Sequence, residues 1–384
     1  MRELATVRRI ERLEPILGAD KIELAHIDGW ECVVRKGIFC EGDPCVYFEI
    51  DAVLPATAKW AQFLRDRKFR VKTARFLKQR SQGLALPLSE VGLNETVLRL
   101  AGVGTDLTKE LGVVKYDPEA VFGRGISRPL SLYKKDSFMF IKRVWDFITG
   151  KPSKQWPSFI PKAGEEWVQN IRNMPQLLKG CLALYSTEKL HGQSATYFLA
   201  RKPGRLCKLL TVANLSEKCW DFGVCSRNLR IPSRKECSWW AVADKYEIEK
   251  ALRLFCLTNN RSLAVQGDII GPGICDNNYR RASYEFFVLS VYDLDAQRYL
   301  CLEEKQGVCS ALGLSCAPLR RVVVVEELLK KEDPRGYLLS LADGPSVLCI
   351  TRPGVLRKGL VFRSLLDDAL SFKAISNRWL DKQK

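Results

Sequence analysis

Residues 186–194 read Ser-Thr-Glu-Lys-Leu-His-Gly-Gln-Ser and continue an apolar, strand-like run, Cys181 to Ser186. A β-prone run that passes into small and polar residues predicts a strand followed by a turn. We therefore expect Lys189 on a turn, at the end of a strand. A lysine three residues before a glycine is common by chance and usually marks an exposed loop, so its interpretation depends on the rest of the chain.

Five further segments accompany this lysine in a fixed order. They are Cys225-Ser226-Arg227-Asn228, Gln266-Gly267-Asp268-Ile269-Ile270-Gly271-Pro272-Gly273-Ile274, Phe286-Phe287-Val288-Leu289, Arg357-Lys358-Gly359-Leu360-Val361-Phe362-Arg363-Ser364 and Ser371-Phe372-Lys373-Ala374-Ile375-Ser376-Asn377. With Glu188-Lys189-Leu190-His191-Gly192 in front, the series resembles motifs I, Ia, III, IIIa, IV and V of RNA ligases of the covalent nucleotidyltransferase superfamily, in the ligase-2 and ligase-5 groups. Each motif is weak alone, but six in order make a specific signal.

The resemblance implies an ATP-dependent RNA ligase in which Lys189 attacks the α-phosphorus of ATP and takes up AMP. A lysine is nucleophilic only when neutral, so we expect burial and neighbouring cations to lower the pKa of Lys189. The resemblance assigns the other site residues as follows: Arg227, Arg363 and Lys373 to phosphate or ribose oxygens, Phe286 to the adenine face, Glu188 and Asp268 to the ribose, and Asp268 also to a divalent metal, Mg²⁺ or Mn²⁺.

Three residues depart from the family pattern. His191 stands where many relatives have aspartate, as it also does in the ligase-2 group. Asp268 replaces a glutamate, and its side chain is shorter by one methylene. Lys358 replaces a glutamate that helps to engage the metal in the family, so the local charge is reversed.

Length and charge agree with a nucleic-acid partner. The chain has 384 residues and 46% hydrophobic residues, enough for two separate cores. Its 61 Lys and Arg against 44 Asp and Glu give a formal charge of +17, which favours a polyanion such as RNA. A basic surface does not specify the RNA, so nicked and broken strands are equally expected partners.

The fold class that follows is α+β, with an N-terminal OB-fold β-barrel and a ligase-type nucleotidyltransferase domain behind it. Short β-prone runs broken by turns predict the barrel: Leu4 to Ile10, Ile22 to Ile27, Glu31 to Val34 and Pro44 to Ile50. We assign residues 1–112 to an OB-fold-like RNA-binding domain, the proline-rich residues 113–163 to a linker and residues 164–384 to the nucleotidyltransferase domain. In the last we expect helices over Glu165–Met174 and Val242–Thr258 and strands over Cys181–Ser186, Phe286–Tyr292 and Val322–Val325.

The segment Lys59 to Arg80 places aromatic residues among cations. Such a segment is typical of a surface on which bases stack while cations contact phosphates. Equally, it fits a long hairpin whose aromatic side chains belong to the core, and the residues alone leave both interpretations open.

Other classes are disfavoured. No long apolar run or leader-like start is present, so we expect an intracellular protein, cytoplasmic or nuclear, without contact to a membrane. The cysteines are scattered and lack CxxC spacing, which favours reduced thiols over disulfides or zinc. We expect a monomer.

Two functions remain. The first is an enzyme that joins 3′-hydroxyl and 5′-phosphate ends of RNA through a lysyl-AMP intermediate, as in RNA repair. The second is a diverged ligase, catalytically impaired at Lys358 and Asp268, that acts as an RNA-end-binding module.

Overall fold

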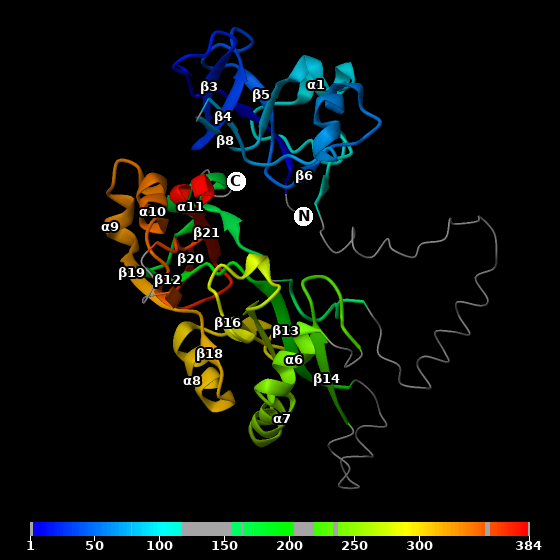
Figure 1. Ribbon diagram of the computed structural model, residues 1–384, viewed down its shortest axis with the longest axis vertical. Coiled ribbons are helices and arrows are strands. Elements are labelled where there is room, and N and C mark those ends of the chain that lie inside the picture. Colours follow the sequence, from blue (N-terminus) through cyan, green and yellow to red (C-terminus); the bar gives the residue numbers. More distant parts are fainter. Residues whose placement is uncertain are drawn as a thin grey trace, which may run out of the picture. The chain divides into compact units, whose positions relative to one another are not determined.

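The computed structural model describes residues 3–77, 79–116, 155–162, 164–171, 173–202, 219–232, 237–349 and 354–382. The chain divides into two compact units, residues 1–130 and 131–384. Most of the predicted linker, residues 117–154, lies outside the described residues. Figure 1 shows the labelled elements of each unit.

The first unit is built from short antiparallel strands, as the sequence predicts. Two three-stranded sheets have the orders β1-β5-β9 and β2-β3-β4. Their strands are β1 (Ala5–Arg9), β2 (Arg12–Pro15), β3 (Ile22–Ile27), β4 (Trp30–Arg35), β5 (Pro44–Phe48) and β9 (Leu84–Pro87). Smaller elements are β6 (Ala52–Val53), β7 (Ala74–Phe76), β8 (Gln79–Ser81), β10 (Val114–Lys115), the 3₁₀ turns η1 (Lys59–Arg67) and η2 (Leu88–Glu90), and α1 (Glu95–Leu100).

The aromatic residues of the basic segment divide between the core and the surface. Trp60 stacks on Phe48 with ring centroids 5.5 Å apart and packs against the core of the unit. Phe63 and Phe76, by contrast, are 59% and 39% exposed. The segment forms η1 and the short β7–β8 hairpin, so the single long hairpin considered above is wrong.

The second unit contains two sheets. The five-stranded sheet has the order β11-β21-β20-β12-β19, and the six-stranded sheet runs β14-β13-β15-β16-β17, with β18 parallel to β16. The strands are β11 (Glu166–Trp167), β12 (Ala183–Glu188), β13 (Gln193–Arg201), β14 (Trp220–Cys225), β15 (Leu263–Ile270), β16 (Glu285–Asp293), β17 (Arg298–Tyr299), β18 (Ser315–Cys316), β19 (Leu319–Val324), β20 (Gly359–Ser364) and β21 (Ser371–Ile375). Lys189 lies in the connection between β12 and β13, where the chain passes from one sheet to the other.

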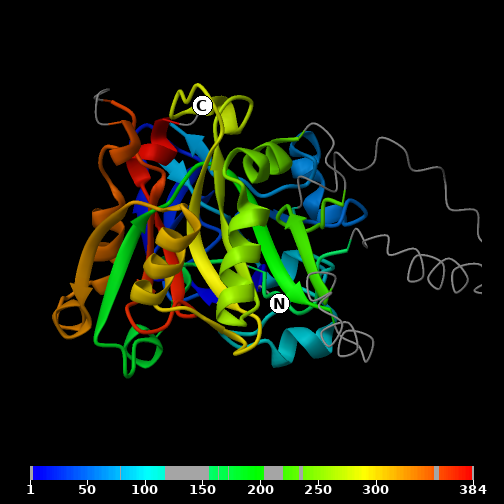
Figure 2. The ribbon, with the colours of Figure 1, turned by 90° about the horizontal axis from the view of Figure 1, so that it is seen from below.

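Helices cover the two sheets on their outer faces. Figure 2 shows α7 and α8 along one face of the six-stranded sheet, where they share a core with its strands. The helices of the unit are α4 (Met174–Leu177), α6 (Ser238–Lys245), α7 (Ile248–Asn259), α8 (Leu302–Leu312), α9 (Val325–Leu329), α10 (Pro334–Ala342) and α11 (Asn377–Lys382), with 3₁₀ turns η4 (Val168–Asn170), η6 (Cys275–Asn277) and η7 (Val347–Cys349).

The predicted helix over residues 165–174 is wrong. Residues 166–167 form β11, which pairs in parallel with β21, and η4 follows. Pro175 lies in the first turn of α4, where a missing N–H costs nothing, so it begins a helix and does not end one. The predicted helix over residues 242–258 is two helices, α6 and α7, separated at Glu247 with a φ of 47°.

The described cysteines carry free thiols. Within the described ranges, no helix has the length and apolarity needed to cross a membrane.

Candidate active site

Lys189 follows β12 and is fixed through its backbone. Its amide donates to the carbonyl oxygen of Gly359 at 2.9 Å, which ties the end of β12 to the beginning of β20. Three residues later, Gly192 passes close to β15, and a Cβ there would lie 2.6 Å from the Ile269 carbonyl oxygen. Only glycine fits this approach, so the glycine of motif I sets how the turn meets the six-stranded sheet.

Asp268 is the nearest carboxylate to Lys189. It lies on β15, where the register shifts between Gln266 and Gly267. A Cβ on Gly267 would meet the Phe287 carbonyl oxygen at 2.2 Å, so this bulge requires glycine. The Asp268 side chain is buried, with Oδ2 3.5 Å from Lys189 Nζ and Oδ1 accepting from Ser194 Oγ at 3.2 Å.

Glu165 is the site residue that the sequence analysis missed. Its Oε2 lies 3.9 Å from Lys189 Nζ, and its Oε1 lies 3.5 Å from the Arg363 guanidinium. The Lys373 ammonium donates to the Glu165 backbone carbonyl at 3.0 Å. No motif marks this glutamate, and the parallel pairing of β11 with β21 brings it to the site from far away in the chain.

Four predicted residues therefore meet around one added carboxylate. Lys189, Asp268, Arg363 and Lys373 come from the end of β12, from β15, from β20 and from β21. Arg363 is almost completely buried and also donates to Thr187 Oγ1 at 3.3 Å, while its Nε has no hydrogen-bond partner. The group joins cations of motifs I, IV and V to two carboxylates.

The pKa of Lys189, together with that of its partner Glu165, differs from the value expected from the sequence. Burial alone would lower the pKa of Lys189, but the carboxylates of Asp268 and Glu165 outweigh it and raise that pKa above its ordinary value. Burial would raise the pKa of Glu165, but Lys189, Arg363 and Lys373 lower it to about 2. The expected lowering of the Lys189 pKa is therefore wrong, and its ammonium is charged at neutral pH.

Glu188 does not reach this group of side chains. It is fully buried, accepts a hydrogen bond from Ser346 Oγ, and accepts a second from the Val347 backbone amide at 3.0 Å. Burial raises its pKa, which these two hydrogen bonds and nearby arginines partly offset. In this structure the carboxylate of Glu188 holds the segment around η7 against β12.

Phe286 also lies outside the group. It is 1% exposed and belongs to the core between the six-stranded sheet and its helices, with its ring edge-on to Tyr197 at 5.1 Å. Its neighbour Phe287 is the cross-strand partner of Asp268 and is only partly buried. Because paired residues of neighbouring strands share a face, Phe287 is the aromatic residue on the face of Asp268.

Arg227 is exposed, in the turn that follows β14. The last residue of β14, Cys225, is paired with Thr196, two positions along β13 from Ser194, which contacts Asp268. Arg227 thus follows the site end of β14, but no contact joins it to the Lys189 group.

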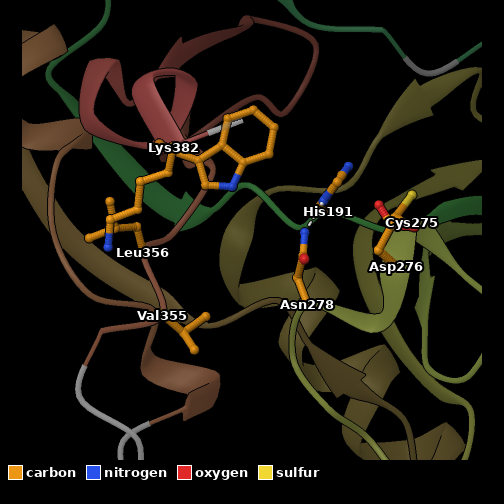
Figure 3. A pocket seen from close by; sticks show the side chains of 8 residues that line it. His191, Cys275, Asp276, Asn278, Val355, Leu356 and Lys382 are labelled. Carbon is orange, nitrogen blue, oxygen red and sulfur yellow. Dashed lines mark hydrogen bonds between the residues drawn. The ribbon is translucent and has the colours of Figure 1, made fainter. Parts of the chain in front are cut away.

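A cavity of about 550 Å³ opens beside His191. Figure 3 shows His191 and Asn278 pointing toward one another, with the His191 Nδ1 and Asn278 Nδ2 atoms 2.7 Å apart. Burial, followed by the charge of Lys358, lowers the pKa of His191 to about 4, so the ring is neutral at neutral pH. The cavity is lined by His191, Cys275, Asp276, Asn278, Val355, Leu356, Trp379 and Lys382.

Lys358 lies directly before β20, next to the residue that holds the Lys189 backbone. Its ammonium is 5.4 Å from the centroid of the Trp379 ring. Burial and the neighbouring charge of Lys189 lower the pKa of Lys358 to about 8. The charge reversal expected from the sequence therefore falls inside the site and not on the outer surface.

The carboxylates do not form a metal cage. Asp268 and Glu165 are each paired with cations, and both oxygens of Glu188 accept hydrogen bonds elsewhere. In the ranges that the structure describes, no three His, Cys, Asp or Glu side chains are grouped closely enough to hold a metal ion. A hard divalent cation prefers several oxygen ligands, so the residues present do not fit a metal held by the protein alone.

Comparisons with known proteins agree with this geometry. A family model described as RNA ligase matches residues 183–375, and one described as an OB-fold domain matches residues 4–88. Among solved structures, the Naegleria gruberi RNA ligase with PPi is 31% identical, with a TM-score of 0.73, and the match covers 100% of this chain and 99% of that one. Two mutants of that ligase, one with ATP and Mn and one with AMP and Mn, match with the same identity and TM-score. No curated protein sequence matches the chain.

Proposed function

The chain belongs to the RNA ligase family, and on this basis we propose that it joins 3′-hydroxyl and 5′-phosphate ends of RNA through an AMP bound covalently to Lys189. ATP is the nucleotide, and broken or nicked RNA is the substrate, as in RNA repair. The observation that carries the proposal is the contact of Lys189 with Asp268 and Glu165, backed by Arg363 and Lys373. A partly buried lysine among paired charges is suited to covalent catalysis, and the cations suit a phosphate ligand.

In the first step Lys189 Nζ must lose a proton. Asp268 Oδ2 is the closest carboxylate oxygen, at 3.5 Å, whereas Glu165 is the poorer base because its pKa is about 2. The neutral amine forms a bond to the α-phosphorus of ATP, and its nitrogen releases a second proton to solvent as the phosphoramidate forms. The bond from that phosphorus to the bridging oxygen breaks, and pyrophosphate leaves with the electron pair. The proton passes from Asp268 to solvent.

Two transfers complete the reaction. An oxygen of the RNA 5′-phosphate attacks the phosphorus of lysyl-AMP, the N–P bond breaks, and Lys189 takes a proton back. The RNA 3′-hydroxyl then attacks the 5′-phosphorus, AMP leaves with the electron pair of the anhydride bond, and the hydroxyl proton goes to solvent. Each step concentrates negative charge on phosphate oxygens. Arg363 and Lys373, which lie beside Glu165, contribute the positive charge that stabilises it.

The adenine contact belongs to Phe287 in this proposal. That side chain shares the face of Asp268, whereas Phe286 fills the core behind the strand. Arg227, at the exposed end of β14, contributes a planar fork to phosphate or ribose oxygens once ligand is bound. Mg²⁺ or Mn²⁺ would enter with the nucleotide, because the residues that the structure describes do not form a metal site of their own.

The N-terminal unit serves as an RNA-binding domain in this proposal. The exposed rings of Phe63 and Phe76 lie in a segment rich in Lys and Arg, and exposed rings beside cations suit single-stranded RNA.

The proposal is tested by incubating the full chain with ATP labelled at the α-phosphate, in parallel with ATP labelled at the γ-phosphate. We expect label on the denatured protein from the first nucleotide alone, and none with Lys189→Ala. Equal labelling of the alanine variant would assign the nucleophile to another residue.

A binding module is the second candidate, and it is favoured by Lys358 and Asp268, which stand where the family has glutamates. The same experiment separates the two. A chain that binds RNA ends and never takes up label is the binding module.

A further inference from the structure

The ammonium of Lys358 lies close enough to Lys189, Asp268 and Glu165 to feel their charges, but it forms no ion pair within the described ranges. Lys189 has Asp268 and Glu165 as partners, and Arg363 has Glu165. Among the residues that the structure describes, no carboxylate lies within ion-pair distance of Lys358 Nζ, and its recorded contact is the ring of Trp379 at 5.4 Å. The side chain is partly buried, and Asp268 and Glu165 act on its charge from beyond ion-pair distance. The ammonium therefore remains available for direct contact with an anionic ligand.

The position of Lys358 is fixed by the backbone on both sides. Its own carbonyl oxygen accepts from the Ser376 amide at 2.9 Å, and the carbonyl oxygen of the next residue, Gly359, accepts from the Lys189 amide at 2.9 Å. The nucleophile and this second lysine are therefore held next to one another by the ends of β12, β20 and β21.

Space for the anion lies beside this cation. Trp379, whose ring the ammonium approaches, lines the cavity of about 550 Å³, and so does His191. His191 is neutral and adds no positive charge. Lys382 adds a cation and Asp276 a carboxylate to the lining of the cavity. A phosphate at its Trp379 edge lies next to the Lys358 ammonium.

We propose that the ammonium of Lys358 binds the phosphates of ATP directly and supplies the positive charge that a protein-held divalent metal would otherwise supply beside Lys189. The inference rests on the proposed function. It explains why the described part of the site contains a second lysine and no group of three metal-ligating side chains. During attack by Lys189 on the α-phosphorus, the charge of Lys358 offsets the negative charge that leaves with pyrophosphate.

The test measures binding of metal-free ATP to the full chain by calorimetry in excess chelator, before any chemistry. The parent protein should bind, and Lys358→Gln should bind roughly ten- to a hundredfold more weakly, as expected for loss of one charge-assisted contact. Lys358→Glu should bind metal-free ATP more weakly still. Added Mn²⁺ should increase the ATP affinity of Lys358→Glu by a larger factor than it increases the ATP affinity of the parent. Lys358→Arg retains the charge and should stay within about tenfold of the parent.

Lys330→Gln serves as the matched control, because this lysine lies after α9 and is exposed and paired with Glu326. It should bind as the parent does. The inference is overturned if the parent binds ATP only when a divalent metal is present. It is also overturned if Lys358→Gln binds metal-free ATP as tightly as the parent.

Covalent labelling of Lys189 separates this failure from failure of the proposed function. One outcome is that the parent is labelled only when metal is present, and that Lys358→Gln is labelled at the same rate. This outcome would overturn the role of Lys358 and leave the ligase activity intact. Absence of label under every condition would overturn the ligase, while the binding of metal-free ATP would still decide whether Lys358 contacts phosphate.

Discussion

Glu165→Gln is the most informative single change, because this residue joins Lys189, Arg363 and Lys373. The pKa of Glu165 is about 2, against 4.5 for an ordinary glutamate. Each pKa unit corresponds to about 1.4 kcal/mol, so the ionised carboxylate stabilises the folded unit by about 3 kcal/mol at neutral pH. Loss of one partner from a buried ion pair costs a similar amount.

The expected result is a lower melting temperature. For a unit of this size each kcal/mol shifts the midpoint by about 2–4 °C, so Glu165→Gln should melt about 6–12 °C below the parent at pH 7. Because the folded pKa lies below the unfolded one, the stabilisation is present above about pH 4.5 and is lost as the pH falls toward 2. Melting curves followed by tryptophan fluorescence at several pH values would therefore converge in acid.

The control is Glu326→Gln on α9, which removes an exposed carboxylate paired with Lys330. Surface pairs are worth about 0–1 kcal/mol, so its midpoint should stay close to that of the parent. Equal midpoints for Glu165→Gln and the parent at pH 7, or a difference that grows as the pH falls, would refute this account of Glu165.

Two further changes test the arrangement around Lys189. Phe286→Ala should lower the free energy of unfolding of the unit by about 3–5 kcal/mol in denaturation, because it leaves a core cavity. Phe287→Ala should cost less stability and weaken ATP binding about tenfold. The reverse pattern would return the adenine contact to Phe286. Asp268→Asn removes the carboxylate that most raises the pKa of Lys189, so the pH at half-maximal labelling should move to lower values, and an unchanged midpoint would show that Asp268 does not control the proton of Lys189.

The sequence by itself determined the family and the barrel strands, and it predicts Lys189 as the nucleophile. Strands such as β3 and β5 follow from short β-prone runs between turns, which are local signals. Gly192 and Gly267 belong to recognisable motifs because the backbone there passes too close to a neighbour for any side chain. The reversed charge at Lys358 is likewise evident in the sequence.

Tertiary structure decided which residues meet. Glu165 has no local signal, since only the pairing of β11 with β21 brings it to Lys189. The same is true of the face of a strand: Phe286 and Phe287 are adjacent in the sequence, but β16 turns the first into the core and places the second beside Asp268. The charge of Lys189 was decided in the same way, because a pKa depends on distances to carboxylates that a linear pattern does not contain.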